Sequence, residues 1–144
     1  MNRGFTLLEL LIVVAIIAVA SAAVSLSMRD SSETQLEREG QRLAALLEAA
    51  RARSRASGVP VRWRGTPDAF VFDGLPPGSL PEKWDSADTQ ISATAPVLLL
   101  GPEPIVGAQS VDISSRRNPQ QRLRIATDGV RPFAVLAAPE VVQN

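Results

Sequence analysis

The feature that most constrains this chain is an apolar run close to its N-terminus. Residues 5–26 read FTLLELLIVVAIIAVASAAVSL. A helix of about 20 predominantly apolar residues is long enough to cross a bilayer. We therefore expect a transmembrane helix over residues 5–28, and Arg3 in front of it weakly favours a cytoplasmic N-terminus. A secretory signal peptide cut near residues 20–22 is the alternative, but it would have a longer charged leader and a shorter apolar region.

Glu9 is the unusual residue of this run. A carboxylate within the hydrocarbon region costs a few kcal/mol on lenient insertion scales, and such residues commonly have a function. In a single chain, Glu9 could lie near the interface and reach water. We favour instead the hypothesis that it pairs with a cation of a neighbouring chain.

The composition argues against catalysis. The sequence has 15 basic and 15 acidic residues and contains neither histidine nor cysteine. The commonest general base and the thiol nucleophile are thereby excluded, as is a disulfide framework. A membrane-tethered enzyme would depend on Ser, Asp, Glu or the single lysine, Lys83, and no nucleophile-elbow or phosphate-loop motif is present. We expect no enzymatic activity, cofactor, metal or small-molecule ligand.

A second helix pattern follows over residues 29–57. An amphipathic stripe is formed by Leu36, Leu43, Leu47 and Ala50, with Leu46 alongside. Gly58 is suited to end the helix, and Pro60 forbids its continuation. Arg51, Arg53 and Arg55 complement the negative end of the helix dipole, and a small phosphate-binding patch is the alternative interpretation.

Residues 58–144 contain all the prolines of the chain and have a β pattern. Residues 59–63 and 69–72 predict a hairpin, with Val59, Val61 and Trp63 on one face. Residues 74–90 predict a long surface loop, in which Trp84 anchors to the domain. Short strands are expected at 97–100, 105–106 and 111–113, followed by a polar turn over 114–121.

A last hairpin is expected within residues 123–136. Asp128 and Gly129 form its turn signal, Phe133 and Val135 belong to its second strand, and Pro132 indicates an edge or a bulge. Asp128 alone cannot supply the six to eight oxygen ligands that calcium takes. The whole pattern predicts an α+β fold in which a long N-terminal helix packs on an antiparallel sheet or sandwich.

The segment Gly4-Phe-Thr-Leu-Leu-Glu-Leu-Leu-Ile12 resembles the N-terminal motif of type IV pilins and of the pseudopilins of type II secretion. The resemblance implies a leader of residues 1–4, cleavage by a prepilin peptidase between Gly4 and Phe5, and N-methylation of Phe5. It also implies that Glu9 meets the N-terminal ammonium of the adjacent subunit during filament assembly. Thr6, between these residues, is interpreted as a tolerated small residue rather than one bonded to a helix carbonyl.

Later segments resemble the H-type minor pseudopilins and, less specifically, related pilus-associated minor pilins. These segments are residues 36–54, 58–61, 100–105 and 124–133. The resemblance implies a pilin-like fold and a bacterial inner-membrane protein with its C-terminal domain in the periplasm. It also implies a subunit of the pseudopilus that drives export of folded proteins. Implied partners are other pseudopilins, the prepilin peptidase/methyltransferase, the inner-membrane secretion platform and membrane lipid.

The sequence leaves two other interpretations of the chain. A minor type IV pilin could serve pilus assembly, adhesion, motility or DNA uptake, and Arg116, Arg117, Arg122 and Arg124 could form a local basic patch. The nearly balanced charge of residues 60–144 makes nucleic acid an unfavoured partner. An unrelated domain anchored by a single span is the other alternative.

Overall fold

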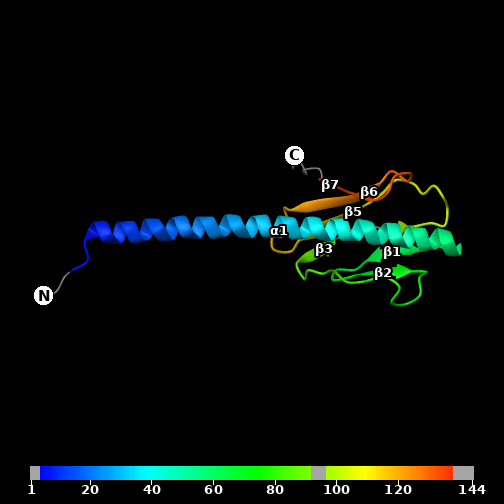
Figure 1. Ribbon diagram of the computed structural model, residues 1–144, viewed down its shortest axis with the longest axis horizontal. Coiled ribbons are helices and arrows are strands. Elements are labelled where there is room, and N and C mark those ends of the chain that lie inside the picture. Colours follow the sequence, from blue (N-terminus) through cyan, green and yellow to red (C-terminus); the bar gives the residue numbers. More distant parts are fainter. Residues whose placement is uncertain (1–3, 92–96, 138–144) are drawn as a thin grey trace. The chain divides into compact units, whose positions relative to one another are not determined.

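The computed structural model describes residues 4–91 and 97–137, apart from the side chains of residues 28–30 and 137 (Figure 1). The chain divides into two units, Met1–Thr34 and Gln35–Asn144. One helix, α1 (Leu7–Ser57), contributes to both. The strands are β1 (Arg62–Gly65), β2 (Phe70–Asp73), β3 (Thr89–Ile91), β4 (Val97–Leu99), β5 (Gln109–Ser115), β6 (Arg122–Thr127) and β7 (Ala134–Ala137).

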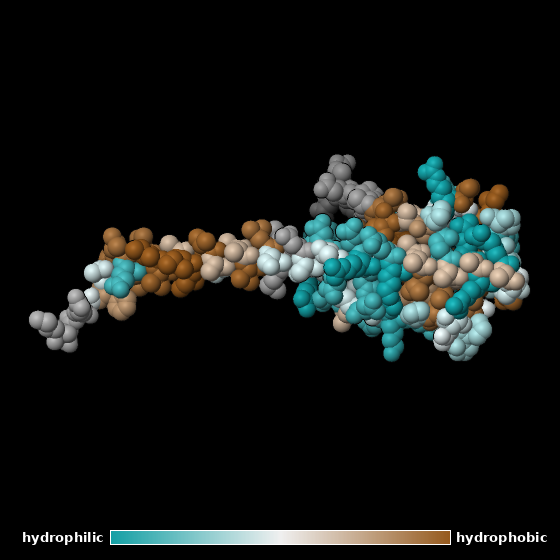
Figure 2. Space-filling model, viewed as in Figure 1, coloured by the Kyte–Doolittle hydropathy of each residue, from teal (hydrophilic) through white to brown (hydrophobic). Residues whose placement is uncertain are grey.

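In the first unit the expected apolar helix is present, and its side chains from Leu7 to Ser27 are exposed. Figure 2 shows this part of α1 as a mainly brown to tan, hydrophobic surface with one teal, hydrophilic patch near its N-terminal end. A helix that is apolar all round is typical of burial in a membrane or in another apolar surrounding.

The part of α1 in the second unit buries the predicted stripe. Leu36, Leu43, Leu47 and Ala50 are at most 4% exposed, and Leu46 is partly buried beside them. The helix ends as predicted: Gly58 has a φ of 69°, and its N–H donates to the carbonyl of Ser54 over 2.8 Å. A left-handed residue just past the last turn is the usual way to satisfy a terminal carbonyl, and glycine adopts it without strain.

The strands form two antiparallel sheets, of orders β2-β1-β4 and β3-β5-β6-β7. Trp63 lies in β1, the middle strand of the first sheet, and pairs with Phe72 of β2 on one side and Leu98 of β4 on the other. Trp84 lies with its ring 4.8 Å from that of Phe70, which confirms the predicted anchoring tryptophan. These rings and the helix stripe belong to one hydrophobic core.

The second sheet lies against α1 at a glycine. A Cβ on Gly40 would lie 3.2 Å from Cγ2 of Val135, in β7, and 3.6 Å from Cδ1 of Leu123, in β6. The absence of a side chain therefore lets the helix approach these two strands closely.

A side chain links the two sheets. Oε1 of Gln109, in β5, accepts from the N–H of Leu99 over 2.6 Å, and Nε2 donates to the carbonyl of Leu99 over 2.9 Å. The amide thus reproduces the pair of hydrogen bonds that a neighbouring strand would make to β4.

Several predicted boundaries are wrong. Val61 and Trp63 are fully buried, but Val59 is 46% exposed because it belongs to the turn that ends α1, where Ser54 Oγ donates to its carbonyl. The predicted loop 74–90 overlaps β3, which pairing with β5 stabilises. The predicted turn 114–121 starts two residues too early, since Ser114 and Ser115 still belong to β5. Residues 105–106 form no strand.

The last hairpin is confirmed as β6 and β7, and β7 is an edge strand as Pro132 indicated. The connection between β6 and β7 runs over residues 128–133 and is longer than a two-residue turn. Phe133, predicted in the second strand, belongs to this connection and is buried in the core. Asp128 is a turn residue as predicted: its Oδ1 accepts from the N–H groups of Val130 and Arg131 over 2.9 and 2.7 Å.

Candidate functional site

The expected processing site lies in exposed, non-helical chain at the start of the described residues. Gly4, Phe5 and Thr6 precede α1, and Phe5 is 80% exposed. A Cβ on Gly4 would find no atom within 4 Å. The Gly4–Phe5 peptide bond is therefore sterically open to an enzyme.

Glu9 lies in the first turn of α1, where its negative charge is favourable to the helix dipole. Its backbone N–H donates to the carbonyl of Thr6 over 3.1 Å and to the hydroxyl of Thr6 over 3.2 Å. Within residues 4–91 and 97–137, no hydrogen bond or ion pair to the Glu9 carboxylate is found. This carboxylate is exposed, so it is available to a cation from another chain.

The interpretation of Thr6 as a tolerated small residue is wrong, since its hydroxyl accepts the Glu9 amide at the helix start. The sequence carried the signal for this role. Thr6-Leu-Leu-Glu9 has the S/T-x-x-E spacing of a capping box, but it is embedded in an apolar run.

The membrane-spanning potential of α1 rests on length and composition. The described residues contain one helix with an 18-residue apolar window sufficient to cross a bilayer, and none of that window is buried within the protein. Together, the open Gly4–Phe5 bond, the free carboxylate of Glu9 and the exposed apolar surface behind them make up the N-terminal site.

In the second unit, polar side chains on the buried face of α1 hold loops of the β-domain, and sequence analysis missed them. Glu39 is 3% exposed, and its Oε1 accepts from the N–H of Ser86 over 2.8 Å. Arg42 donates to the carbonyl of Lys83 over 3.0 Å and contacts the carboxylate of Asp85 at 3.3 Å. The partners of Glu39 and Arg42 lie more than 40 residues away in the sequence, so no local sequence pattern predicts these contacts.

The three arginines near the end of α1 do not form the phosphate-binding patch considered from the sequence. Arg51 is buried and donates to the carbonyl of Gly129 over 2.8 Å, and Arg53 donates to the carbonyl of Ser79 over 2.8 Å. Arg55 alone of the three has no hydrogen bond or ion pair within the part of the chain that the structure describes.

The possible basic patch of the C-terminal region is largely neutralised. Arg116 pairs with Asp68, Arg117 with Asp88 at 2.8 Å, and Arg124 with Asp112 at 2.7 Å. The hydrogen bonds from Arg124 lower the pKa of Asp112, and the nearby positive charge of the same arginine adds to the effect. Three of these four guanidinium groups are thus already matched by carboxylates.

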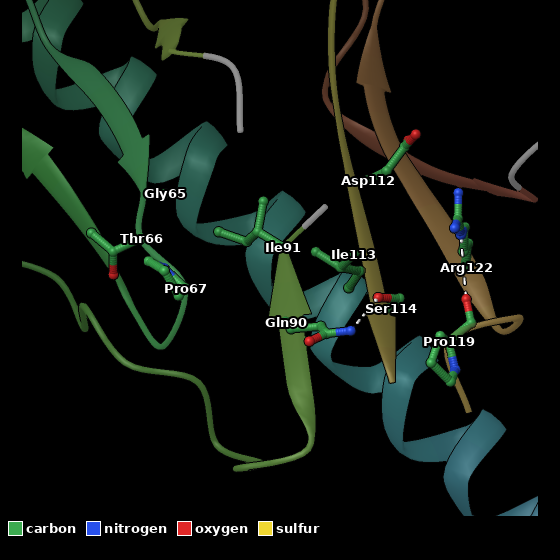
Figure 3. Close-up of a pocket in the computed structure, with 10 residues that line it drawn as sticks. All are labelled: Gly65, Thr66, Pro67, Gln90, Ile91, Asp112, Ile113, Ser114, Pro119 and Arg122. Atoms are coloured by element: carbon green, nitrogen blue, oxygen red, sulfur yellow. Dashed lines mark hydrogen bonds between the residues drawn. The ribbon is translucent and has the colours of Figure 1, made fainter. Parts of the chain in front are cut away.

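Figure 3 shows a groove of about 550 Å³ between the β1–β2 turn, with Thr66 and Pro67, and strands β3 and β5. Gln90 Nε2 donates to Ser114 Oγ over 3.3 Å across its floor, and Arg122 Nε donates to the carbonyl of Pro119 over 3.3 Å. Asp112, the one carboxylate among the described residues that line the groove, is held by Arg124. No group of three or more His, Cys, Asp or Glu side chains placed to hold a metal occurs in the described segments.

One comparison with known proteins falls on the N-terminal site, and another extends over most of the chain. The family model of the prokaryotic N-terminal methylation motif matches residues 1–25. Over 146 aligned positions, the chain is 28% identical to the type II secretion system protein H of Escherichia coli (strain K12), covering 95% of this chain and 81% of that protein. No solved structure matches the chain.

Proposed function

We propose that this chain, a pseudopilin-like type IV pilin by its methylation motif and its similarity to protein H, is a minor pseudopilin of a type II secretion system. In this role the precursor is cut between Gly4 and Phe5 and methylated on the new amino group of Phe5. The mature chain then joins a short filament that drives folded proteins across the outer membrane.

The observation that carries the proposal is the arrangement at the helix start. An open Gly4–Phe5 bond, an unpaired Glu9 carboxylate and an exposed apolar helix follow one another within residues 4–27. Cleavage creates an α-amino group with a reference pKa of about 7.7–8.0, which is mostly cationic at neutral pH. Methylation keeps that charge. In an apolar bundle of helices, Glu9 of one subunit offsets the ammonium of the next and sets their register.

Similarity to a pseudopilin implies contact with other pseudopilins and with the secretion machinery in general, and the apolar helix suggests anchoring in the inner membrane. We further propose that the prepilin peptidase/methyltransferase and the inner-membrane platform act on the N-terminal region and that the β-domain is periplasmic. On this proposal the protein is an assembly subunit, not an enzyme, and it needs no cofactor.

A minor type IV pilin is the alternative, because the methylation motif alone does not distinguish a pilus from a pseudopilus. A DNA-binding role is the least supported of its variants. Three of the four arginines that could contact phosphate are paired with carboxylates of the same chain.

The deciding experiment is deletion of the gene in its own host, with exoprotein activity in the medium, twitching and DNA uptake measured in parallel. Exoproteins retained in the periplasm with normal pili would support the secretion role. Normal secretion with lost twitching or transformation would assign the chain to the pilus. Complementation with the intact gene must restore whichever function is lost.

A further inference from the structure

The hydroxyl of Thr6 accepts a hydrogen bond at the start of α1. The N–H of Glu9 donates to both Oγ1 and the carbonyl of Thr6, over 3.2 and 3.1 Å, and the same carbonyl accepts from the N–H of Leu10 over 3.2 Å. The helix starts at the next residue, Leu7. Thr6 is therefore the N-cap residue, and Glu9 occupies the third helical position, whose N–H is one of those that an N-cap side chain commonly accepts from.

The neighbours of Thr6 have the residue types of a complete helix-start signal. Thr6 and Glu9 have the capping-box spacing, and Phe5 and Leu10 stand where a hydrophobic staple has its two apolar residues. The box is only half formed, because the described residues show no bond from the Glu9 carboxylate to the Thr6 amide. The backbone of Glu9 thus supports the helix start while its side chain remains free.

This helix start controls the state of the peptide bond in front of it. In an α-helix, a carbonyl accepts from the N–H four residues later. A helix that included Gly4 would engage the Gly4 carbonyl with the N–H of Leu8, and the bond would have to unwind before a peptidase could attack it. With the helix starting at Leu7, Gly4 and Phe5 are non-helical and exposed.

We propose that Thr6 is a positioning residue for processing: its hydroxyl fixes the helix start and leaves the Gly4–Phe5 bond unwound for the prepilin peptidase. The inference rests on the proposed function, in which that bond is cut. Upstream of Thr6, Asn2 belongs to a residue type that is preferred at the N-cap of a helix. Without the Thr6 hydroxyl, a helix begun at Asn2 competes and takes the Gly4–Phe5 bond into its first turn.

The test measures initial cleavage rates of the full-length precursor, in membranes that contain its own peptidase, by pulse–chase. Thr6→Val is nearly isosteric and lacks the hydroxyl, and we expect about fivefold slower cleavage, in line with the usual strength of one N-cap. Thr6→Ser and Thr6→Asn restore a capping oxygen and are cut at close to the wild-type rate. Asn2→Ala added to Thr6→Val removes the competing start and recovers most of the rate.

A second measurement reports on the helix itself. Amide hydrogen exchange of the detergent-solubilised precursor should show a slower-exchanging Leu8 amide in Thr6→Val than in wild type or Thr6→Asn, because a helix that includes Gly4 bonds this amide to the Gly4 carbonyl. Wild-type cleavage of Thr6→Val would overturn the inference. Equal slowing of Thr6→Val and Thr6→Asn would also overturn it, because the peptidase would then recognise threonine directly.

The experiment distinguishes failure of the proposed processing from failure of the proposed role of Thr6. A wild-type precursor that is never cut between Gly4 and Phe5 removes the processing assignment, and with it any role of Thr6 in processing. A wild-type precursor that is cut there, with all Thr6 variants cut equally fast, leaves the proposed function intact and removes only the role of Thr6.

Discussion

Arg51 and Gly129 are joined by a hydrogen bond of 2.8 Å from the buried guanidinium Nη2 to the backbone carbonyl, across 78 residues of sequence. The same guanidinium lies 3.5 Å from Oε1 of Glu48, which accepts from the N–H of Phe133 over 3.0 Å. One turn of α1 therefore holds both halves of the connection between β6 and β7.

Arg51→Met is expected to lower the free energy of unfolding of the full chain in detergent by about 3 kcal/mol. The substitution keeps an apolar stem but leaves the Gly129 carbonyl and the Glu48 carboxylate without their buried partner. Arg55→Met is the matched control, since Arg55 is exposed one turn later, and it should cost less than about 1 kcal/mol. Equal losses in a denaturant titration would contradict a special role for Arg51.

Gly129→Ala is expected to cost more than about 2 kcal/mol of stability. Gly129 has a φ of 97°, and an added Cβ would lie 1.8 Å from the carbonyl oxygen of Val106. Gly107→Ala, where a Cβ meets no atom within 4 Å, should be nearly neutral. Thermal unfolding of both variants measures the difference, and similar melting temperatures would contradict the contact.

The Asp112–Arg124 pair predicts a specific acid sensitivity. The pKa of Asp112 is lowered in the folded chain, first of all by the hydrogen bonds from Arg124. The stabilisation is therefore present above the unfolded pKa of about 3.9 and is lost as the pH falls through the lower folded value.

Wild type should consequently lose more stability between about pH 5 and pH 2 than Asp112→Asn does. Arg124→Gln should flatten the stability profile in the same way, because it removes the other partner. Denaturant titrations across this pH range provide the comparison. Parallel profiles for wild type and both variants would show that the pair contributes nothing to acid sensitivity.

Glu9→Gln should be cut normally after Gly4 but incorporated at least about tenfold less into the filament, because in the proposed assembly the ammonium of the neighbouring subunit would lose its counter-charge. The measurement is the fraction of mature chain recovered in sheared filaments relative to membranes. Glu33→Gln removes another exposed acid of α1 and should be incorporated normally. Normal incorporation of Glu9→Gln would exclude the carboxylate as the register determinant.

Gly4→Ala should leave the precursor at full length, because it introduces a side chain at the residue whose carbonyl carbon the peptidase is proposed to attack. N-terminal sequencing and gel mobility distinguish precursor from mature chain. Ala20→Leu is the control that separates the two kinds of processing, since it would block a signal-peptide cut near residues 20–22 and spare a cut at Gly4. Mature protein beginning at Phe5 in the Gly4→Ala variant would overturn the cleavage assignment.

The periodic features of the fold could be predicted because each depends on neighbours in sequence. Leu36, Leu43 and Leu47 repeat at helical spacing and are buried, and the alternation of Val61 and Trp63 marks the first hairpin. The buried polar residues could not be predicted in this way. The role of Glu39 depends on Ser86, whose position is set by folding of the β-domain.

The prediction of short strands failed for a related reason. β3 has three residues, and its existence depends on pairing with Ile113–Ser115 rather than on its own composition. Ile105 and Val106 have strand-like side chains but form no strand, and the carbonyl of Val106 lies against Gly129 instead. At the N-terminus the error concerned chemistry: the apolar surroundings of Thr6 concealed a capping signal.

The two hydrogen bonds between Gln109 and Leu99 limit strand addition from other chains at the edge of the first sheet. β4 is an edge strand with half-exposed Val97 and Leu99, the kind of strand to which a foreign segment could add. At Leu99, however, both backbone groups that such a segment would need are already bonded to a side chain of the same molecule. If the chain assembles as proposed, this position of β4 is thereby protected from strand pairing with chains other than its filament neighbours.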